Sequence, residues 1–159
     1  MESRVSEILR MVEVVFPNTT NHYGTMFGGK VLDLMDRAAF ICASRFSNLS
    51  MVTASTEHMD FFTPIRHGNL VELVAKVVFT GRASLIVRVD LHSEDPIGQK
   101  KALASQGYFH MVAVDEKGKS VPVPKMEIRT TREQEEWDYC TTLYEKRRIR
   151  KINSNRDLL

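Results

Sequence analysis

The sequence predicts an α+β fold in which a curved antiparallel β-sheet wraps around one long central helix, with a second, polar helix at the C-terminal end. The central helix is indicated by the segment from Lys30 to about Arg45, which has no glycine or proline and is rich in leucine, methionine and alanine. Four runs of β-branched and aromatic residues follow it. Short turns separate these runs, and this arrangement favours an antiparallel meander.

The strands are expected in a definite order along the chain. A short run, Val12–Phe16, predicts a first strand ahead of the central helix. The later strands are expected at Met51–Phe62, Leu70–Phe79, Ser84–His92 and Ala102–Val114. Within the third of these four, leucine and valine occupy every second position from Leu85 to Leu91, which is the period of a half-buried strand.

A polar helix is predicted over Thr130–Lys151, and it ends in the basic run Glu145–Lys151. We therefore expect a main domain over residues 1–128, followed by a C-terminal basic helix and tail over residues 129–159. A chain of 159 residues is long enough to bury one core of its own.

Composition and charge narrow the class of protein. The net charge of +2 gives no reason to expect a nucleic-acid partner. No apolar run approaches the roughly 20 residues of a membrane helix, so membrane insertion is not expected. Cys42 and Cys140 read as reduced thiols, and neither the cysteines nor the five histidines follow a metal-binding spacing. These features predict a cytoplasmic protein without a bound metal.

Asp36 is a carboxylate on an apolar helix face. At 100° per residue, Leu32, Asp36, Ala39 and Ala43 share one narrow face that is otherwise suited to close packing on a sheet. A carboxylate there needs hydrogen-bond partners, a cleft or a shifted pKa. A structural hydrogen bond and acid–base chemistry both fit this position.

Gly28 and Gly29 lie where the central helix begins. Consecutive glycines let a ligand approach the free N–H groups of the first helical turn, which can stabilise a developing oxyanion. The alternative is a tight turn that needs positive φ. Gly28 and Asp36 are eight residues apart, or about 12 Å along a helix. If both act on one substrate, they should therefore come from different protomers.

An ordered set of residues resembles the hotdog-fold acyl-CoA thioesterase family. The set runs from Asn21 through Gly24, Phe27-Gly28-Gly29 and Asp36 to Val52-Thr53-Ala54-Ser55, Gly68 and Val112-Ala113-Val114-Asp115, and ends at Pro122-Val123-Pro124. It spans about Val14 to Pro124, although many relatives have histidine in place of Phe27. The likeness is strongest to bacterial single-domain members and to each half of the animal tandem-hotdog cytosolic hydrolases.

The resemblance implies an activity and an assembly. The activity is hydrolysis of acyl-CoA to a free fatty or short-chain acid and coenzyme A, which is substrate and product rather than a cofactor. Dimers would share one continuous sheet, often within a trimer of dimers. Asp36 matches the catalytic carboxylate, Asn21 matches a second catalytic residue from the opposite protomer, and Gly28 matches the backbone N–H that polarises the thioester carbonyl. Asp36 could act as a general base or attack the carbonyl itself.

The resemblance also implies a binding site for coenzyme A. Gly29, the strand Ala54-Ser55-Thr56 and the turn Ala83-Ser84-Leu85 would lie beside the pantetheine chain. Arg147 and Arg148, with Arg82 as a further candidate, would contact the phosphates, since arginine suits bidentate contact. The alternative for the basic run is a solvated helix end whose charge suits the helix dipole.

Two other functions remain open from the sequence. A hotdog hydratase or dehydratase would also bind acyl thioesters, but it normally pairs a histidine with an acidic residue in the site. A non-catalytic acyl-CoA sensor, or a nucleic-acid-binding module that uses the basic C-terminus, would need no catalytic carboxylate at all.

Overall fold

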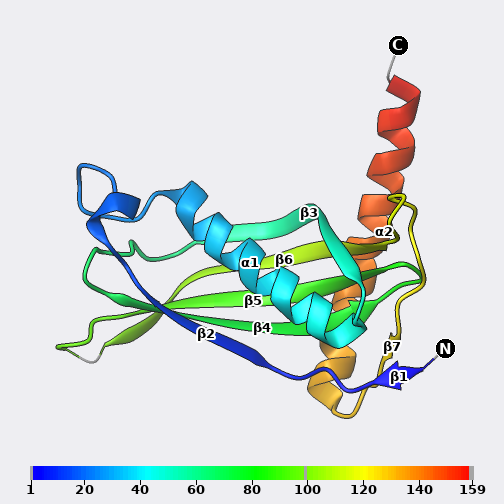
Figure 1. Ribbon diagram of the computed structural model, residues 1–159, viewed down its shortest axis with the longest axis horizontal. Helices are drawn as coiled ribbons and strands as arrows, with labels where there is room; N and C mark the ends of the chain where they lie inside the picture. Colours follow the sequence, from blue (N-terminus) through cyan, green and yellow to red (C-terminus); the bar gives the residue numbers. More distant parts are fainter. Residues whose placement is uncertain (1, 99, 158–159) are drawn as a thin grey trace.

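A five-stranded antiparallel sheet lies between two helices in the computed structural model, which describes residues 2–98 and 100–157 (Figure 1). The strands are β2 (Leu9–Val14), β3 (Ser50–Phe61), β4 (Leu70–Thr80), β5 (Ser84–Glu94) and β6 (Lys101–Val114). The helices are α1 (Gly28–Ser47) and α2 (Thr131–Asp157). Shorter elements are the paired strands β1 (Ser3–Arg4) and β7 (Lys125–Met126) and the 3₁₀ turn η1 (Pro17–Thr19). The predicted α+β fold is confirmed.

The strand order is β2-β4-β5-β6-β3, so the predicted meander is right only for β4, β5 and β6. β3 precedes β4 in the chain, yet it pairs with β6 at the far edge of the sheet. Residues 62–69, which join β3 to β4, do not form a tight hairpin. They bond instead to the segment ahead of α1, where the Met26 N–H donates to the Ile65 carbonyl at 2.7 Å. β2 and β3 are consequently the two edge strands.

The buried face of α1 differs from the face that the sequence suggested. Its core residues recur every three or four positions, and they include Val31, Leu34, Met35, Ala38, Ala39, Cys42 and Phe46. Ala39 and Ala43 are fully buried, but Leu32 is 38% exposed and Asp36 is only half-buried. The predicted narrow face therefore runs along the edge of the buried surface. This position leaves Asp36 within reach of a ligand.

Helix α2 packs on the sheet face opposite α1. Its side chains Trp137, Cys140, Leu143 and Tyr144 contact a second apolar cluster that contains Val78, Phe79, Ile86 and Tyr108. A reciprocal cap fixes its start, because Thr130 Oγ1 accepts from the Glu133 N–H at 3.1 Å and Glu133 Oε2 accepts from the Thr130 N–H at 3.3 Å. The helix continues past the predicted end at Lys151 to Asp157 and rises beyond the sheet (Figure 1). The boundary between residues 128 and 129 remains a prediction, and residues 158 and 159 lie outside the described part.

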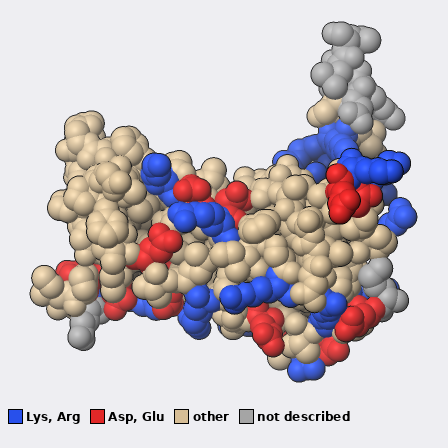
Figure 2. Space-filling model, viewed as in Figure 1, with Lys and Arg blue, Asp and Glu red and all other residues tan. Residues whose placement is uncertain are grey.

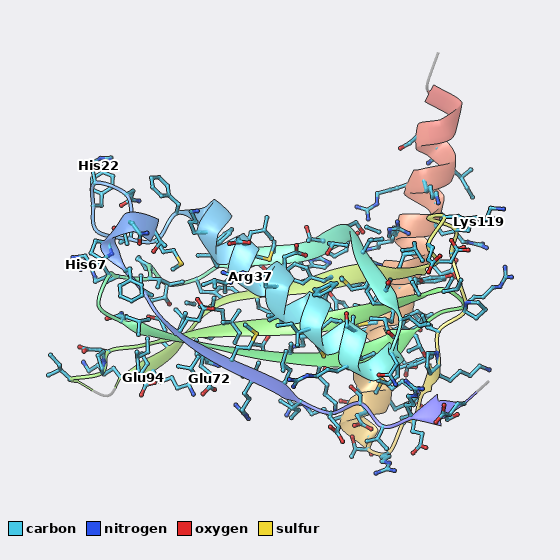
Figure 3. All side chains as sticks on the ribbon, in the orientation of Figure 1. His22, Arg37, His67, Glu72, Glu94 and Lys119 are labelled. Atoms are coloured by element: carbon cyan, nitrogen blue, oxygen red, sulfur yellow. The ribbon has the colours of Figure 1, made fainter. Side chains whose placement is uncertain are left out.

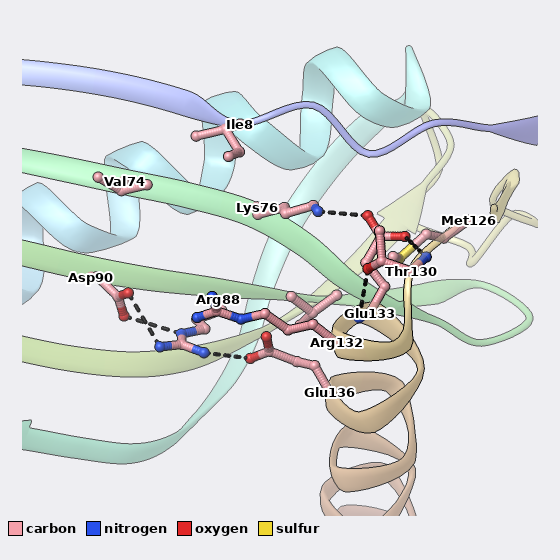
Figure 4. A pocket seen from close by; sticks show the side chains of 11 residues that line it. Ile8, Val74, Lys76, Arg88, Asp90, Met126, Thr130, Arg132, Glu133 and Glu136 are labelled. Atoms are coloured by element: carbon pink, nitrogen blue, oxygen red, sulfur yellow. Dashed lines mark hydrogen bonds and ion pairs between the residues drawn. The ribbon is translucent and has the colours of Figure 1, made fainter. Parts of the chain in front are cut away.

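Ion pairs hold the first turns of α2 on β4 and β5 around a hollow of about 310 Å³ (Figure 4). Lys76 Nζ lies 2.7 Å from Glu133 Oε1, and Arg88 bridges Glu136 at 2.9 Å and Asp90 at 3.2 Å. Apart from Arg132, the charged residues that line this hollow pair with one another, which indicates a structural role. None of the helices described is long and apolar enough to cross a membrane.

Candidate functional site

Asp36 is held by a residue of β3. Thr53 Oγ1 donates a hydrogen bond of 2.6 Å to Asp36 Oδ1. A carboxylate accepts at both oxygens, so Oδ2 remains available for a water or a substrate. Thr53 belongs to the motif in the sequence, but the motif alone predicts no role for it. Its function follows only once β3 is seen to pass beside α1.

The start of α1 is open to a ligand. Phe27 provides no side-chain cap, and the first N–H groups of a helix have no partner within the helix. The glycines with positive φ are Gly24, Gly68 and Gly118, so Gly28 and Gly29 are not required by a turn. A Cβ atom on Gly28 would lie 3.6 Å from Phe61 Cζ, and one on Gly29 would meet nothing within 4 Å. The tight-turn alternative is therefore wrong, and the backbone here is accessible.

Asn21 closes the loop ahead of α1. Its Oδ1 accepts from the Tyr23 N–H at 2.9 Å, from the Thr25 N–H at 3.2 Å and from Thr25 Oγ1 at 3.1 Å. These bonds use the carbonyl oxygen, so the side-chain NH₂ is the group that could contact a substrate. The neighbouring His22 lies near His67 at one end of the molecule (Figure 3), where the His67 N–H donates to the Gly24 carbonyl at 3.1 Å.

Three hollows of about 310, 380 and 450 Å³ lie among the described residues, and Asn21, Gly28 and Asp36 line none of these three. One turn to either side of Asp36 on α1, the side chains of Leu32 and Phe40 are apolar and exposed, and the neighbouring strand β3 is an edge strand. An unpaired edge strand beside exposed apolar residues is typical of an interface.

A bulge in β3 directs neighbouring residues to opposite faces of the sheet. Thr53 and Ser55 would share a face in a regular strand, but the register with β6 shifts between them. Thr53 therefore faces α1 and Asp36, whereas Ser55 Oγ accepts from Arg147 Nε of α2 at 3.1 Å. The strand predicted to bind pantetheine thus connects the carboxylate with the arginines. Ala54 and Thr56 on the same strand are exposed.

The predicted phosphate-binding arginines do not all point the same way. Arg147 faces β3, but Arg148 pairs with Glu145 of its own helix at 3.5 Å. The residue that joins Arg147 on the β3 side is Arg150, which pairs with Glu57. Residues three apart on a helix share a side, so the helix phase explains this difference.

The turn before β5 fits the predicted binding site only in part. Leu85 is fully buried in the core, and the carbonyl of Ala83 already accepts from the Ala113 N–H at 2.9 Å. Ser84 is half-buried, and the Arg82 side chain is exposed. Tyr144 of α2 covers this turn, since a Cβ atom on Gly81 would lie 3.1 Å from Tyr144 Cε2.

His110, for which the sequence predicts no role in the site, lies beneath Arg147. His110 is directly opposite Ser55 on β6 and is 2% exposed. Burial, together with the Arg147 guanidinium, lowers the pKa of His110 to about 4, so the ring is neutral near pH 7. Its Nε2 has no partner among the described residues. No group of three or more metal-ligating side chains occurs in the described residues.

Comparison with known sequences identifies relatives over most of the chain. The sequence model of a family described as the thioesterase superfamily matches residues 23–98. An uncharacterized acyl-CoA thioester hydrolase of Bacillus subtilis is 36% identical over 132 residues, which cover 83% of this chain and 74% of that protein. The human cytosolic acyl coenzyme A thioester hydrolase is 30% identical over 131 residues, which cover 80% of this chain and 34% of that protein.

Solved structures give the same picture. An acyl-CoA hydrolase from Staphylococcus aureus, in complex with butyryl coenzyme A and coenzyme A, is 34% identical with a TM-score of 0.84, covering 94% of this chain and 91% of that one. Its variants with alanine in place of one threonine, one aspartate or one asparagine are similar as well. An apo-hexameric acyl-CoA thioesterase is 36% identical with a TM-score of 0.86, covering 94% of this chain and 97% of that one.

Proposed function

Because the chain belongs to the thioesterase superfamily and its relatives are acyl-CoA thioester hydrolases, we propose that it hydrolyses acyl-CoA at a site shared by two protomers. The observation that carries this proposal is the Asp36 carboxylate, which Thr53 holds on the exposed face between α1 and β3. The asparagine, aspartate and threonine replaced in the Staphylococcus aureus enzyme stand in its sequence at the same intervals as Asn21, Asp36 and Thr53. This correspondence supports all three assignments.

The proposed reaction proceeds by attack on a polarised thioester. The thioester oxygen accepts from the Gly28 N–H at the start of α1, where one such donor is worth about 3 kcal/mol of barrier. Asp36 removes a proton from a water that attacks the carbon, or it attacks the carbon itself to give an anhydride that water then opens. The carbon–sulfur bond breaks, coenzyme A leaves as a thiolate and takes up a proton, and the free acid remains.

The shared site follows from helix geometry. Gly28 and Asp36 of one α1 are about 12 Å apart, which is too far for both to contact one thioester carbon. A partner protomer that pairs along β3 would bring its own α1 and Asn21 loop to the exposed surface around Asp36. The Asn21 NH₂ would then orient the carbonyl or the attacking water. The hexameric relative supports a trimer of such dimers.

Coenzyme A would pass around the edge of β3. The bulge between Thr53 and Ser55 places the acyl end near Asp36 on one face and the nucleotide end near Arg147 on the other. The pantetheine chain would lie along Ala54–Thr56 and near Ser84, and Gly29 would leave room at the helix start. Arg147 would contact the phosphates, with Arg148 and Arg82 on the surrounding surface.

The proposal includes a cytoplasmic location and excludes a metal cofactor from the reaction. The human relative is described as cytosolic, which supports the location. Water, one carboxylate and backbone donors supply the whole reaction above. The hydratase and sensor alternatives gain no support from the relatives, which are described as hydrolases.

The test is release of coenzyme A thiol from acyl-CoAs of increasing chain length, with Asp36→Asn as the variant. We expect the wild-type enzyme to release thiol and Asp36→Asn to lose at least about a hundredfold in rate, or about 2.7 kcal/mol of barrier. Light scattering would check that the variant remains assembled. An Asp36→Asn variant that keeps the wild-type rate would refute the catalytic role of Asp36. A wild-type chain that never releases thiol would refute the proposed hydrolase activity.

A further inference from the structure

Charged residues gather where α2 crosses β3. This arginine cluster consists of Arg147 and Arg150 from α2, with Ser55 and Glu57 from β3, above His110 of β6. Arg147 Nε donates to Ser55 Oγ at 3.1 Å, and Arg150 forms an ion pair with Glu57. In Figure 2, Lys and Arg side chains collect at the base of the rising part of α2, with acidic side chains beside them.

Glu57 is the anion of this cluster, and the fold holds it in place. It lies opposite Tyr108 on the strand face that α2 covers, and its side chain is only 15% exposed. Immediately after it the register of β3 shifts, and His58 adopts a left-handed backbone with φ 49°. Arg150, by contrast, is 58% exposed. A fixed carboxylate therefore meets a solvent-exposed guanidinium.

We propose that Glu57 is an internal counter-ion that pairs with Arg150 in the free enzyme and that the phosphates of coenzyme A displace it on binding. This inference rests on the proposed function, because it places the phosphates on the same side of α2 as Arg147. It also makes Arg150, rather than Arg148, the second phosphate-binding arginine. Glu57 thereby sets the affinity for the nucleotide end of the substrate without taking part in the reaction.

Electrostatics favours such an exchange. The Arg150 side chain is 58% exposed, so water screens its ion pair with Glu57, and displacement of this pair opposes binding only modestly. A phosphate carries more charge than a carboxylate and offers arginine two acceptor oxygens at once. His110 is neutral at pH 7 and adds no charge, so the two arginines leave the cluster one positive charge in excess over Glu57. After displacement, the nearby Glu57 carboxylate still repels the phosphate and limits its affinity.

The deciding variant is Glu57→Gln, which keeps the shape of the side chain and removes its charge. We expect its KM for an acyl-CoA to fall about two- to fivefold with kcat unchanged. An acyl-pantetheine thioester has the same reacting end but no phosphate, and its KM should not change. Arg150→Gln should raise the KM for acyl-CoA and leave that for acyl-pantetheine unaltered. The difference between the KM changes for acyl-CoA and for acyl-pantetheine should shrink at high salt, because salt screens the charges.

Glu145→Gln is the matched control, because Glu145 also pairs with an arginine of α2 but on the side away from β3. If Glu145→Gln lowered the KM for acyl-CoA equally, the fall seen in Glu57→Gln would be explained by surface charge in general, and the proposal would be overturned. An unchanged or higher KM in Glu57→Gln, or an equal change for both substrates, would also overturn it.

Calorimetry with coenzyme A alone separates this inference from the proposed function. Tighter binding to Glu57→Gln than to wild type would support the counter-ion even in a chain that released no thiol. If both thioesters were hydrolysed normally and Glu57→Gln did not change the affinity for coenzyme A, the proposed hydrolase activity would be supported and the counter-ion role of Glu57 would be refuted.

Discussion

The Thr53 hydroxyl makes the one side-chain hydrogen bond that ties Asp36 to the sheet in the described residues. Thr53→Val keeps the branched shape and removes the donor, so the carboxylate should lose its fixed position. A hydrogen bond to a charged group is worth about 1.5–3 kcal/mol, and we expect kcat for thiol release to fall about tenfold or more. KM should change little, because Thr53 does not face the cluster that would bind the phosphates.

Thr53→Ser provides the control for that experiment. Serine keeps the hydroxyl and loses only a methyl group, so most of kcat should remain. If the valine variant were as active as wild type, or the serine variant as impaired as the valine variant, the hydroxyl would not orient Asp36.

His110 makes stability depend on pH. Its pKa is about 4 in the folded protein against 6.5 for the free side chain, so the unfolded chain binds more protons between these values. The contribution of His110 to the free energy of unfolding is therefore fully present above about pH 6.5. It is lost as the pH drops toward 4, and the total loss is on the order of 3 kcal/mol. Urea unfolding of wild type and His110→Phe at several pH values measures this difference.

The His110→Phe curve should be flatter than the wild-type curve over that range. His22→Phe, at an exposed position, should keep the wild-type slope (Figure 3). Parallel curves for wild type and His110→Phe would contradict a neutral buried ring.

At the scale of elements, the local sequence pattern predicted whether each segment is a helix or a strand better than it predicted the neighbours of each strand in the sheet. Composition and periodicity identified both helices and the five strands of the sheet, and turn residues marked most of their ends. The first strand, however, runs over Leu9–Val14 rather than the predicted Val12–Phe16. Strand neighbours depend on the path of residues 62–69, which bond across space to the loop ahead of α1, and no local pattern encodes that contact. β3 was therefore expected beside β4 and is found beside β6.

The site shows the same limit. The motif indicated Asn21, Gly28 and Asp36, because their chemistry and order can be read along the chain. The choice of Arg150 over Arg148 depends on the phase with which α2 packs on the sheet, and that phase is fixed by Trp137 and Leu143 far from the basic run. The bulge between Thr53 and Ser55 contains no glycine or proline that would predict it from the sequence.

At the scale of the whole molecule, the edge strand β3 accounts for both halves of the proposed site. It carries Thr53 toward α1 and Ser55 toward α2, and as an edge strand it leaves one row of backbone groups unpaired within the described sheet. In one protomer Asp36 is half-buried beside exposed apolar residues of α1, and it lines none of the three hollows of about 310, 380 and 450 Å³. If the site is shared as proposed, assembly is required for catalysis, rather than only for stability.

Mixing two inactive variants tests this requirement directly. Asp36→Asn retains Asn21, and Asn21→Ala retains Asp36. In a dimer with one protomer of each kind, a shared site can combine the intact Asp36 with the intact Asn21, while the other site carries both lesions. Random exchange makes half of all dimers mixed, so about a quarter of wild-type activity should return after the variants are unfolded and refolded together.

A site built within one protomer predicts the opposite result. Every site would then carry one lesion whatever its partner, and the mixture would stay as inactive as its components. Asp36→Asn refolded with the double variant Asp36→Asn/Asn21→Ala is the control, because no combination of those chains restores Asp36. Recovery in the first mixture but not in the control would establish that each active site takes its aspartate and its asparagine from different chains.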